Sequence, residues 1–123
     1  MVYTAAHRSL SILEVLVHVK GGAGTAKAAI SSPFYIYTVS FDAALLEELP
    51  TSSLPGGWNS EPPTAASQSL GDAWVLAASS PVLAVPSVIV PEERNYILNP
   101  NHPRFPEIQI GIPVVCSIDP RLL

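Results

Sequence analysis

The sequence has few basic residues, which narrows the classes of ligand it can bind. Lysine and arginine number only six among 123 residues, and the formal net charge is −4. A protein that binds the phosphate backbone of nucleic acid concentrates positive charge on one face. Direct binding of nucleic acid is therefore not expected.

Cysteine and long apolar runs are scarce as well. Cys116 is the only cysteine, so no intrachain disulfide can form, which favours a reducing compartment and a cytoplasmic location. The apolar run from Leu10 to Val19 is interrupted by Glu14 and His18, and at about ten residues it falls short of the roughly 20 that span a bilayer. The N-terminus lacks the basic region of a signal peptide. We expect no association with membranes.

The chain contains enough apolar residues to form one hydrophobic core. Hydrophobic residues make up 48% and charged residues 13%, which is the opposite of the balance found in disordered chains. The length predicts a single domain over residues 1–123. Thirteen prolines disfavour long helices. These features predict an α+β fold with two helices among several short strands.

Two helices are expected. The first should begin with Ser9 or Ser11 as N-cap, since Ser11 and Glu14 have the spacing of a capping box, and should end in the glycine-rich stretch 21–24. The second is predicted over Ser67–Ala78. A short helical turn is expected within Phe41–Leu49.

Apolar, β-branched and aromatic stretches predict the strands. The interruption at Pro86-Ser87 should be a bulge, an edge or a kink. We expect Asn95 to Pro106 to be a loop, and the isoleucines of the last strand to share one face. The expected strands are Val2–Thr4, Phe34–Val39, Val82–Val85, Val88–Val90 and Glu107–Val115, with Ile108, Ile110 and Ile112 on the shared face.

Glu14 and Ser87 are the main candidates for chemistry. Glu14 lies in mid-helix among apolar residues, where a carboxylate needs a partner or a proton; it either lines a cleft, or completes the capping box, or pairs with His18 or Lys20. Ser87 lies where a bent strand can direct a side chain into a site, or is a buried serine bonded to nearby backbone. No Gly-x-Ser-x-Gly elbow marks it as a hydrolase nucleophile.

Each of the other candidates has a structural alternative. Tyr3 could stack on a planar ligand or belong to the core. Arg94 and Asn95 could bind an anion at a loop entry or anchor that loop. No metal is expected, because Cys116 stands alone and the three histidines lack the spacing of a zinc site. The glycine-rich stretch 21–24 follows a helix instead of preceding one, so it is not a phosphate-binding loop.

Several ordered blocks of the chain carry a family resemblance. They are Tyr3 to His18, Leu70-Gly71-Asp72-Ala73-Trp74, Val85-Pro86-Ser87-Val88-Ile89-Val90-Pro91, Glu93 to Pro103, and Asp119-Pro120-Arg121-Leu122. Together they resemble the RES domain, a family named for arginine, glutamate and serine. The resemblance implies a fold like that of ADP-ribosyltransferases, and Tyr3, Glu14 and Ser87 match the family's active-site tyrosine, glutamate and serine.

The resemblance also implies a function. RES domains are toxins of toxin–antitoxin pairs that deplete NAD⁺ by phosphorolysis or hydrolysis of the nicotinamide–ribose bond. NAD⁺ would be the substrate, inorganic phosphate a possible co-substrate, and no further cofactor is implied. We expect Glu14 and Ser87 to be catalytic, and Tyr3, His18, Arg94 and Asn95 to bind substrate. The expected partner is a helix-turn-helix antitoxin of the Xre type, in a homo-oligomer or a toxin–antitoxin hetero-oligomer.

One family feature has no counterpart. The arginine of RES domains comes from a Gly-Arg-Trp-Asn type segment upstream of the tyrosine; Trp58-Asn59 echoes it only superficially, in the wrong place and without arginine. We therefore expect that the N-terminal strand segment is missing. Two alternatives stay open: a catalytically silent RES module acting through antitoxin or protein binding, and a protein mono-ADP-ribosyltransferase.

Overall fold

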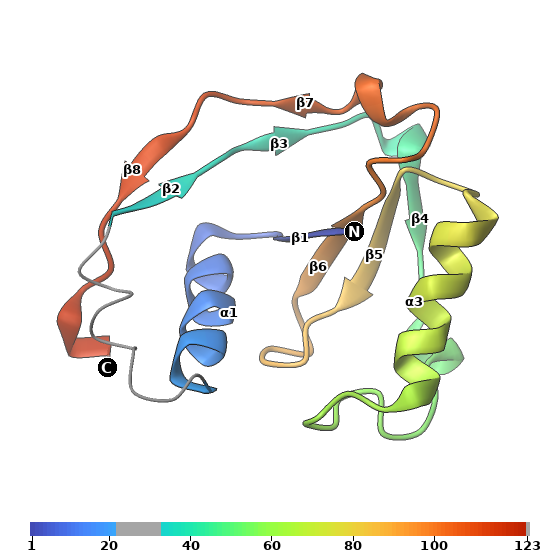
Figure 1. The fold of residues 1–123 in the computed structure, drawn as a ribbon, viewed down its shortest axis with the longest axis horizontal. Coiled ribbons are helices and arrows are strands. Elements are labelled where there is room, and N and C mark those ends of the chain that lie inside the picture. The colour runs from blue at the N-terminus through green and yellow to red at the C-terminus, as the bar shows by residue number, and fades with distance from the viewer. Residues whose placement is uncertain (22–32, 123) are drawn as a thin grey trace.

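A computed structural model describes residues 1–21 and 33–122 of the chain. Its centre is a four-stranded sheet in the order β1-β6-β5-β4, and two further pairs of strands, β2–β8 and β3–β7, extend from it (Figure 1). The helices are α1 (Arg8–Gly21) and α3 (Ala65–Ala77), and the strands are β1 (Val2–Ala5), β2 (Phe34–Ile36), β3 (Val39–Ser40), β4 (Leu46–Glu48), β5 (Val82–Pro86), β6 (Arg94–Leu98), β7 (Gln109–Ile110) and β8 (Val114–Cys116). The expectation of an α+β fold with two helices is confirmed within these ranges.

The central sheet is mixed. β6 pairs antiparallel with both β1 and β5, whereas β4 pairs parallel with β5. β1 is therefore an edge strand, held by backbone bonds and by the Thr4 hydroxyl, which donates to the carbonyl oxygen of Tyr96 at 2.8 Å. Among the described residues, no helix is long and apolar enough to cross a bilayer.

The core has two layers, one on each face of the sheet. Leu45, Val82, Leu98 and Ile108 form one buried cluster, and Trp74 packs with Leu83 and Ile97 in the other. Successive strand residues point to opposite faces, which separates Val82 and Leu98 from Leu83 and Ile97. Figure 1 shows β3 and β7 arching over the sheet, with α1 at its β1 end and α3 at its β4 end.

The second helix lies close to where the sequence places it. It begins after Thr64, whose hydroxyl oxygen accepts a bond from the backbone N–H of Ser67 at 3.2 Å, the usual N-cap geometry. It ends at Ala78, a non-glycine residue with φ +48°. On its buried face, Trp74 Nε1 donates to Ser80 Oγ at 3.1 Å, so the indole nitrogen has a partner inside the core.

The start of the first helix differs from expectation. α1 begins at Arg8, so Ser9 and Ser11 lie inside it and neither is its N-cap. The Ser11 hydroxyl donates a hydrogen bond to the carbonyl oxygen of Arg8, one turn earlier in the helix, at 2.7 Å. The Ser11 side chain therefore bonds within the helix. The capping box with Glu14 was therefore a wrong interpretation. The described part of α1 runs to Gly21, and the rest of the glycine-rich stretch expected to end it, residues 22–24, lies outside the described residues.

Several strand predictions need correction. Val88–Val90 is not a strand, because it belongs to the bend that reverses the chain between β5 and β6. Phe34–Val39 is divided between β2 and β3, and of the three isoleucines expected on one face only Ile108 is buried. Asn95 was expected in a loop but lies in β6. The turn predicted within Phe41–Leu49 is present as a 3₁₀ helix followed by β4.

Candidate functional site

Three polar side chains from separate elements meet at one carboxylate oxygen. Ser87 Oγ donates to Glu14 Oε1 at 3.0 Å, and Asn95 Nδ2 donates to the same oxygen at 2.8 Å. Glu14 comes from the middle of α1, Ser87 follows the last residue of β5, and Asn95 is the second residue of β6. Residues that lie 73 and 81 positions away in sequence thus fix one oxygen of Glu14.

The register of the sheet explains how Ser87 and Asn95 come together. Asn95 is paired with Val85, two residues before Ser87, and the Ser87 backbone N–H continues the ladder by donating to the Glu93 carbonyl at 2.9 Å. Because side chains alternate along a strand, Ser87 and Asn95 point to the same face of the sheet. The hydrogen bonds of Glu14 to both residues place α1 on that side of the sheet.

Ser87 is fully buried and uses its hydroxyl in two directions. Its Oγ accepts the backbone N–H groups of Ile89 and Val90, each at 3.1 Å, and has a relative exposure of 0%. A hydroxyl has one hydrogen to give, and here that hydrogen goes to Glu14. Ser87 therefore closes the bend after β5 and binds the carboxylate with the same atom.

Asn95 has an unequal pair of amide atoms. Its Nδ2 donates to Glu14, whereas its Oδ1 is buried and has no hydrogen-bond partner among the described residues. The amide cannot be turned around, because an ionised carboxylate only accepts hydrogen bonds and Oδ1 would then face Oε1. Glu14 itself is half-buried, and no donor to its Oε2 occurs among the described residues.

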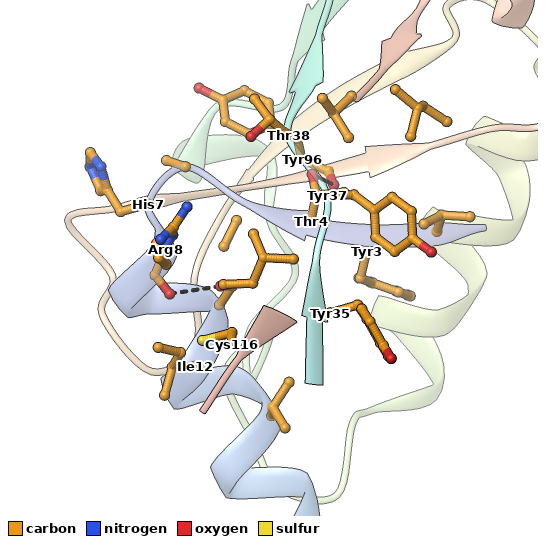
Figure 2. Close-up of a pocket in the computed structure, with 18 of the residues that line it drawn as sticks. Tyr3, Thr4, His7, Arg8, Ile12, Tyr35, Tyr37, Thr38, Tyr96 and Cys116 are labelled. Carbon is orange, nitrogen blue, oxygen red and sulfur yellow. Dashed lines mark hydrogen bonds between the residues drawn. The ribbon is translucent and has the colours of Figure 1, made fainter. Parts of the chain in front are cut away.

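Tyr3 lies on the same sheet face as Asn95 but is largely open to solvent. It pairs with Ile97, two residues along β6 from Asn95, and its relative exposure is 68%. Tyr3 also lines a cavity of about 810 Å³ between β1, the start of α1 and β2. Tyr35 of β2 and Arg8, in the first turn of α1, also line the cavity (Figure 2).

This cavity is not the place where the three polar groups meet. Glu14, Ser87 and Asn95 are absent from its lining, although Ser11 and Val15 of α1 contribute to it. Tyr3 is the predicted site residue that borders the cavity, and Arg8 is a wall residue that the sequence did not single out. The sequence could have pointed to Arg8 as the basic residue at the start of α1, separated from the end of β1 by Ala6 and His7.

Two further predicted site residues lie apart from the cluster. Arg94 precedes Asn95 in β6, so its side chain points to the opposite face, and the two do not form one anion site. His18 is exposed on α1, one turn after Glu14, and no hydrogen bond joins them within the described ranges. No group of three or more histidine, cysteine or acidic residues suited to a metal occurs in residues 1–21 and 33–122.

The Glu14 carboxylate, held by a serine and an asparagine beside the mixed sheet, is the candidate site that the structure brings together. The RES domain family matches residues 1–119 of the chain. The chain is 34% identical to the Prs ADP-ribosylating toxin of Sphingobium sp. (strain YBL2) over its whole length, covering 74% of that protein. It is 32% identical to a protein named toxin Res from Yersinia enterocolitica over 98% of the chain and 76% of that protein.

Another relative, toxin Res from Photorhabdus laumondii, is 35% identical over 80% of the chain and 60% of that protein. The chain therefore belongs to the RES domain family. Its similarity extends to bacterial proteins that are named toxins.

Proposed function

We propose that this protein is a toxin that depletes NAD⁺ by breaking the nicotinamide–ribose bond. The observation that carries the proposal is the Glu14 carboxylate, whose Oε1 is held by Ser87 at 3.0 Å and Asn95 at 2.8 Å while the group remains half open to solvent. Membership of the RES domain family supports it.

The chemistry needs a fixed negative charge. When the bond between ribose C1′ and the pyridinium nitrogen breaks, its electron pair passes to that nitrogen and neutral nicotinamide leaves. The ribose becomes positively charged at C1′, as in glycoside hydrolysis. A carboxylate already oriented toward that carbon stabilises the charge without reorganising. Glu14 is the residue that we assign to this role.

The remaining residues bind and orient. Ser87 gives its single hydrogen to Glu14, so it acts by holding the carboxylate and has no second hydrogen for the ribose. Tyr3, exposed on the same face of the sheet as Asn95, offers a ring on which nicotinamide can stack. His18, exposed one turn along α1 from Glu14, is assigned to an outer part of the substrate, whereas Arg94 points to the opposite face of the sheet and receives no role in this site.

The acceptor of the ADP-ribose group decides the product. Attack by inorganic phosphate forms a phosphorylated ADP-ribose, and attack by water forms ADP-ribose; the attacking oxygen bonds to C1′ and loses a proton. A second candidate, transfer to a protein side chain, is supported by one observation: the relative from Sphingobium is named an ADP-ribosylating toxin.

One experiment tests the proposal and separates the acceptors. Purified protein is incubated with NAD⁺, with and without phosphate, and nicotinamide and the ADP-ribose products are separated chromatographically. A parallel arm uses the protein with whatever the gene encodes upstream of Met1, since an arginine supplied there would neutralise the pyrophosphate. Nicotinamide release in either form supports the proposal, and its absence from both contradicts it.

We further propose a helix-turn-helix antitoxin as partner, in the cytoplasm, in a homo-oligomer or a toxin–antitoxin hetero-oligomer. The relatives named toxin Res support a toxin–antitoxin setting. Co-expression with the product of the neighbouring gene, followed by size-exclusion chromatography, measures the stoichiometry. Elution of the two proteins as separate species contradicts this part of the proposal.

A further inference from the structure

We infer that Asn95 is a positioning residue that fixes which oxygen of Glu14 faces the substrate. This inference rests on the proposed function and deepens it. Asn95 Nδ2 and Ser87 Oγ both donate to Oε1 of Glu14. Oε2 has no donor among the described residues, so the two bonds distinguish the oxygens and leave Oε2 for the reacting carbon.

The surroundings of Asn95 show that it is not placed there for packing. Directly opposite it in register stand Ala5 on β1 and Val85 on β5, both apolar. They offer no side-chain donor, and Asn95 Oδ1 is the one buried side-chain polar atom without a partner in the part of the chain that the structure describes. A buried carbonyl oxygen without a hydrogen-bond partner lowers the free energy of unfolding. Leucine at this position would therefore give a more stable protein than asparagine does.

The direction of the amide follows from the charge of its neighbour. An ionised carboxylate accepts hydrogen bonds and gives none, so Nδ2 must face Glu14 and the unpaired Oδ1 must point away. A hydrogen bond to a charged group is shorter and stronger than one between neutral groups. The 2.8 Å contact fixes the rotation of the Glu14 carboxylate, and the unpaired oxygen is the structural cost of that contact.

The chain provides a matched control in a second asparagine. Asn99, just after β6, is almost fully buried, and its Oδ1 accepts the backbone N–H of Asn101 at 3.1 Å. Both of its amide atoms have partners, since its Nδ2 also reaches the Val75 carbonyl at 3.5 Å. Asn99 therefore stabilises a turn and has no contact with Glu14.

The test compares Asn95→Leu and Asn95→Asp with Asn99→Ala, each measured for nicotinamide release and for urea unfolding. Loss of one hydrogen bond to a charged group corresponds to roughly a tenfold to hundredfold effect. We expect Asn95→Leu to lower kcat by about that factor, with KM unchanged within about threefold and the unfolding midpoint equal or higher. Asn95→Asp, which keeps the shape and removes the donor, should lower kcat at least as far.

Asn99→Ala should do the reverse, lowering the midpoint while kcat of the folded protein stays the same. Three results would overturn the inference: wild-type kcat in Asn95→Leu, a loss confined to KM, or a loss that only follows the folded fraction.

A second measurement separates this inference from the proposed function. The side-chain amide hydrogens of Asn95 are assigned by NMR in the wild type and in Glu14→Leu. We expect one amide hydrogen of the wild type to resonate downfield and to lose that shift in the variant. If wild-type protein releases no nicotinamide but shows this contact, the proposed function fails and the positioning stands. Absence of the shift in the wild type overturns the positioning whatever the activity.

Discussion

Ser87 donates its only hydroxyl hydrogen to Glu14 across 3.0 Å, although 73 residues separate the two in the chain. The same Oγ accepts two backbone N–H groups from the bend after β5. A change at Ser87 therefore acts on the local backbone and on the carboxylate together, and variants must be chosen so that these two effects can be measured apart.

Replacement of Ser87 by alanine should lower both stability and activity. The change leaves the N–H groups of Ile89 and Val90 without their acceptor, which costs about 1–3 kcal/mol of unfolding free energy. Ser80→Ala is the matched control, because Ser80 is also buried and binds Glu47 Oε2 at 2.9 Å. We expect Ser80→Ala to be destabilised similarly in urea and to keep its nicotinamide release. Equal activity in the two variants would count against Ser87.

Tyr3 should influence substrate binding and leave stability unchanged. Because its side chain is 68% exposed, Tyr3→Ala should change the unfolding free energy by less than about 0.5 kcal/mol. Aromatic stacking contributes about 0.5–1.5 kcal/mol, or roughly twofold to tenfold in affinity, so KM for NAD⁺ should rise by that factor. Tyr3→Phe keeps the ring and should keep KM. A KM that rises equally in both variants would assign the effect to the hydroxyl instead.

Arg104 and Glu107 give a stability contribution that depends on pH. The guanidinium binds both carboxylate oxygens, at 2.7 and 3.1 Å, and this hydrogen bonding lowers the pKa of Glu107. A carboxyl group whose pKa is lower in the folded chain than in the unfolded chain contributes stability above its unfolded pKa. That contribution is lost as pH falls through the folded pKa.

The free energies of unfolding of wild type and Arg104→Gln should therefore differ most near neutral pH and converge as the pH falls through the lowered pKa of Glu107 in the folded chain. The difference should be small and should weaken in salt, because both side chains are about half exposed. Urea titrations at several pH values measure it. A difference that grows as the pH falls contradicts the assignment.

The core residue Leu98 should matter for stability alone. It is 1% exposed in β6 and packs with Leu45 and Val82. Leu98→Ala should cost about 2–5 kcal/mol of unfolding free energy. Leu76→Ala, at a leucine of α3 that is 85% exposed, should cost less than about 0.5 kcal/mol. Similar unfolding midpoints for the two variants would contradict the position of β6 in the core.

The two helices and the candidate residues Glu14 and Ser87 could be predicted from the sequence, because the signals for them come from residues close by in the chain. An acid on an apolar helix face needs a partner, and a serine beside proline marks a strand end. The capping box was wrong because α1 begins at Arg8. Both interpretations of Ser87 describe real contacts, since its oxygen binds backbone and carboxylate alike.

The place of Asn95 could not be predicted in the same way. The sequence predicts a loop from Asn95 to Pro106, because the turn-forming pairs Asn99-Pro100 and His102-Pro103 lie within it. Pairing with β1 and β5 makes the start of this segment a strand and turns the side chains of Arg94 and Asn95 to opposite faces. The contact of Asn95 with Glu14 depends on how α1 lies across the sheet, and no local spacing in the sequence encodes that arrangement.

If the Glu14 carboxylate stabilises the positive charge that forms on the ribose, cleavage of NAD⁺ should depend on it more than on any other carboxylate of the chain. The most direct measurement compares nicotinamide release by the variants Glu14→Gln and Glu47→Gln. Glu47 is the matched control, because its carboxylate in the native protein also accepts two hydrogen bonds on one oxygen. The donors are the hydroxyls of Ser79, at 2.7 Å, and Ser80, at 2.9 Å. We expect Glu14→Gln to lose at least about a hundredfold in kcat, the size of effect seen when one electrostatic stabiliser is removed. Glu47→Gln should retain wild-type kcat. Equal rates in the two variants would contradict this role of Glu14.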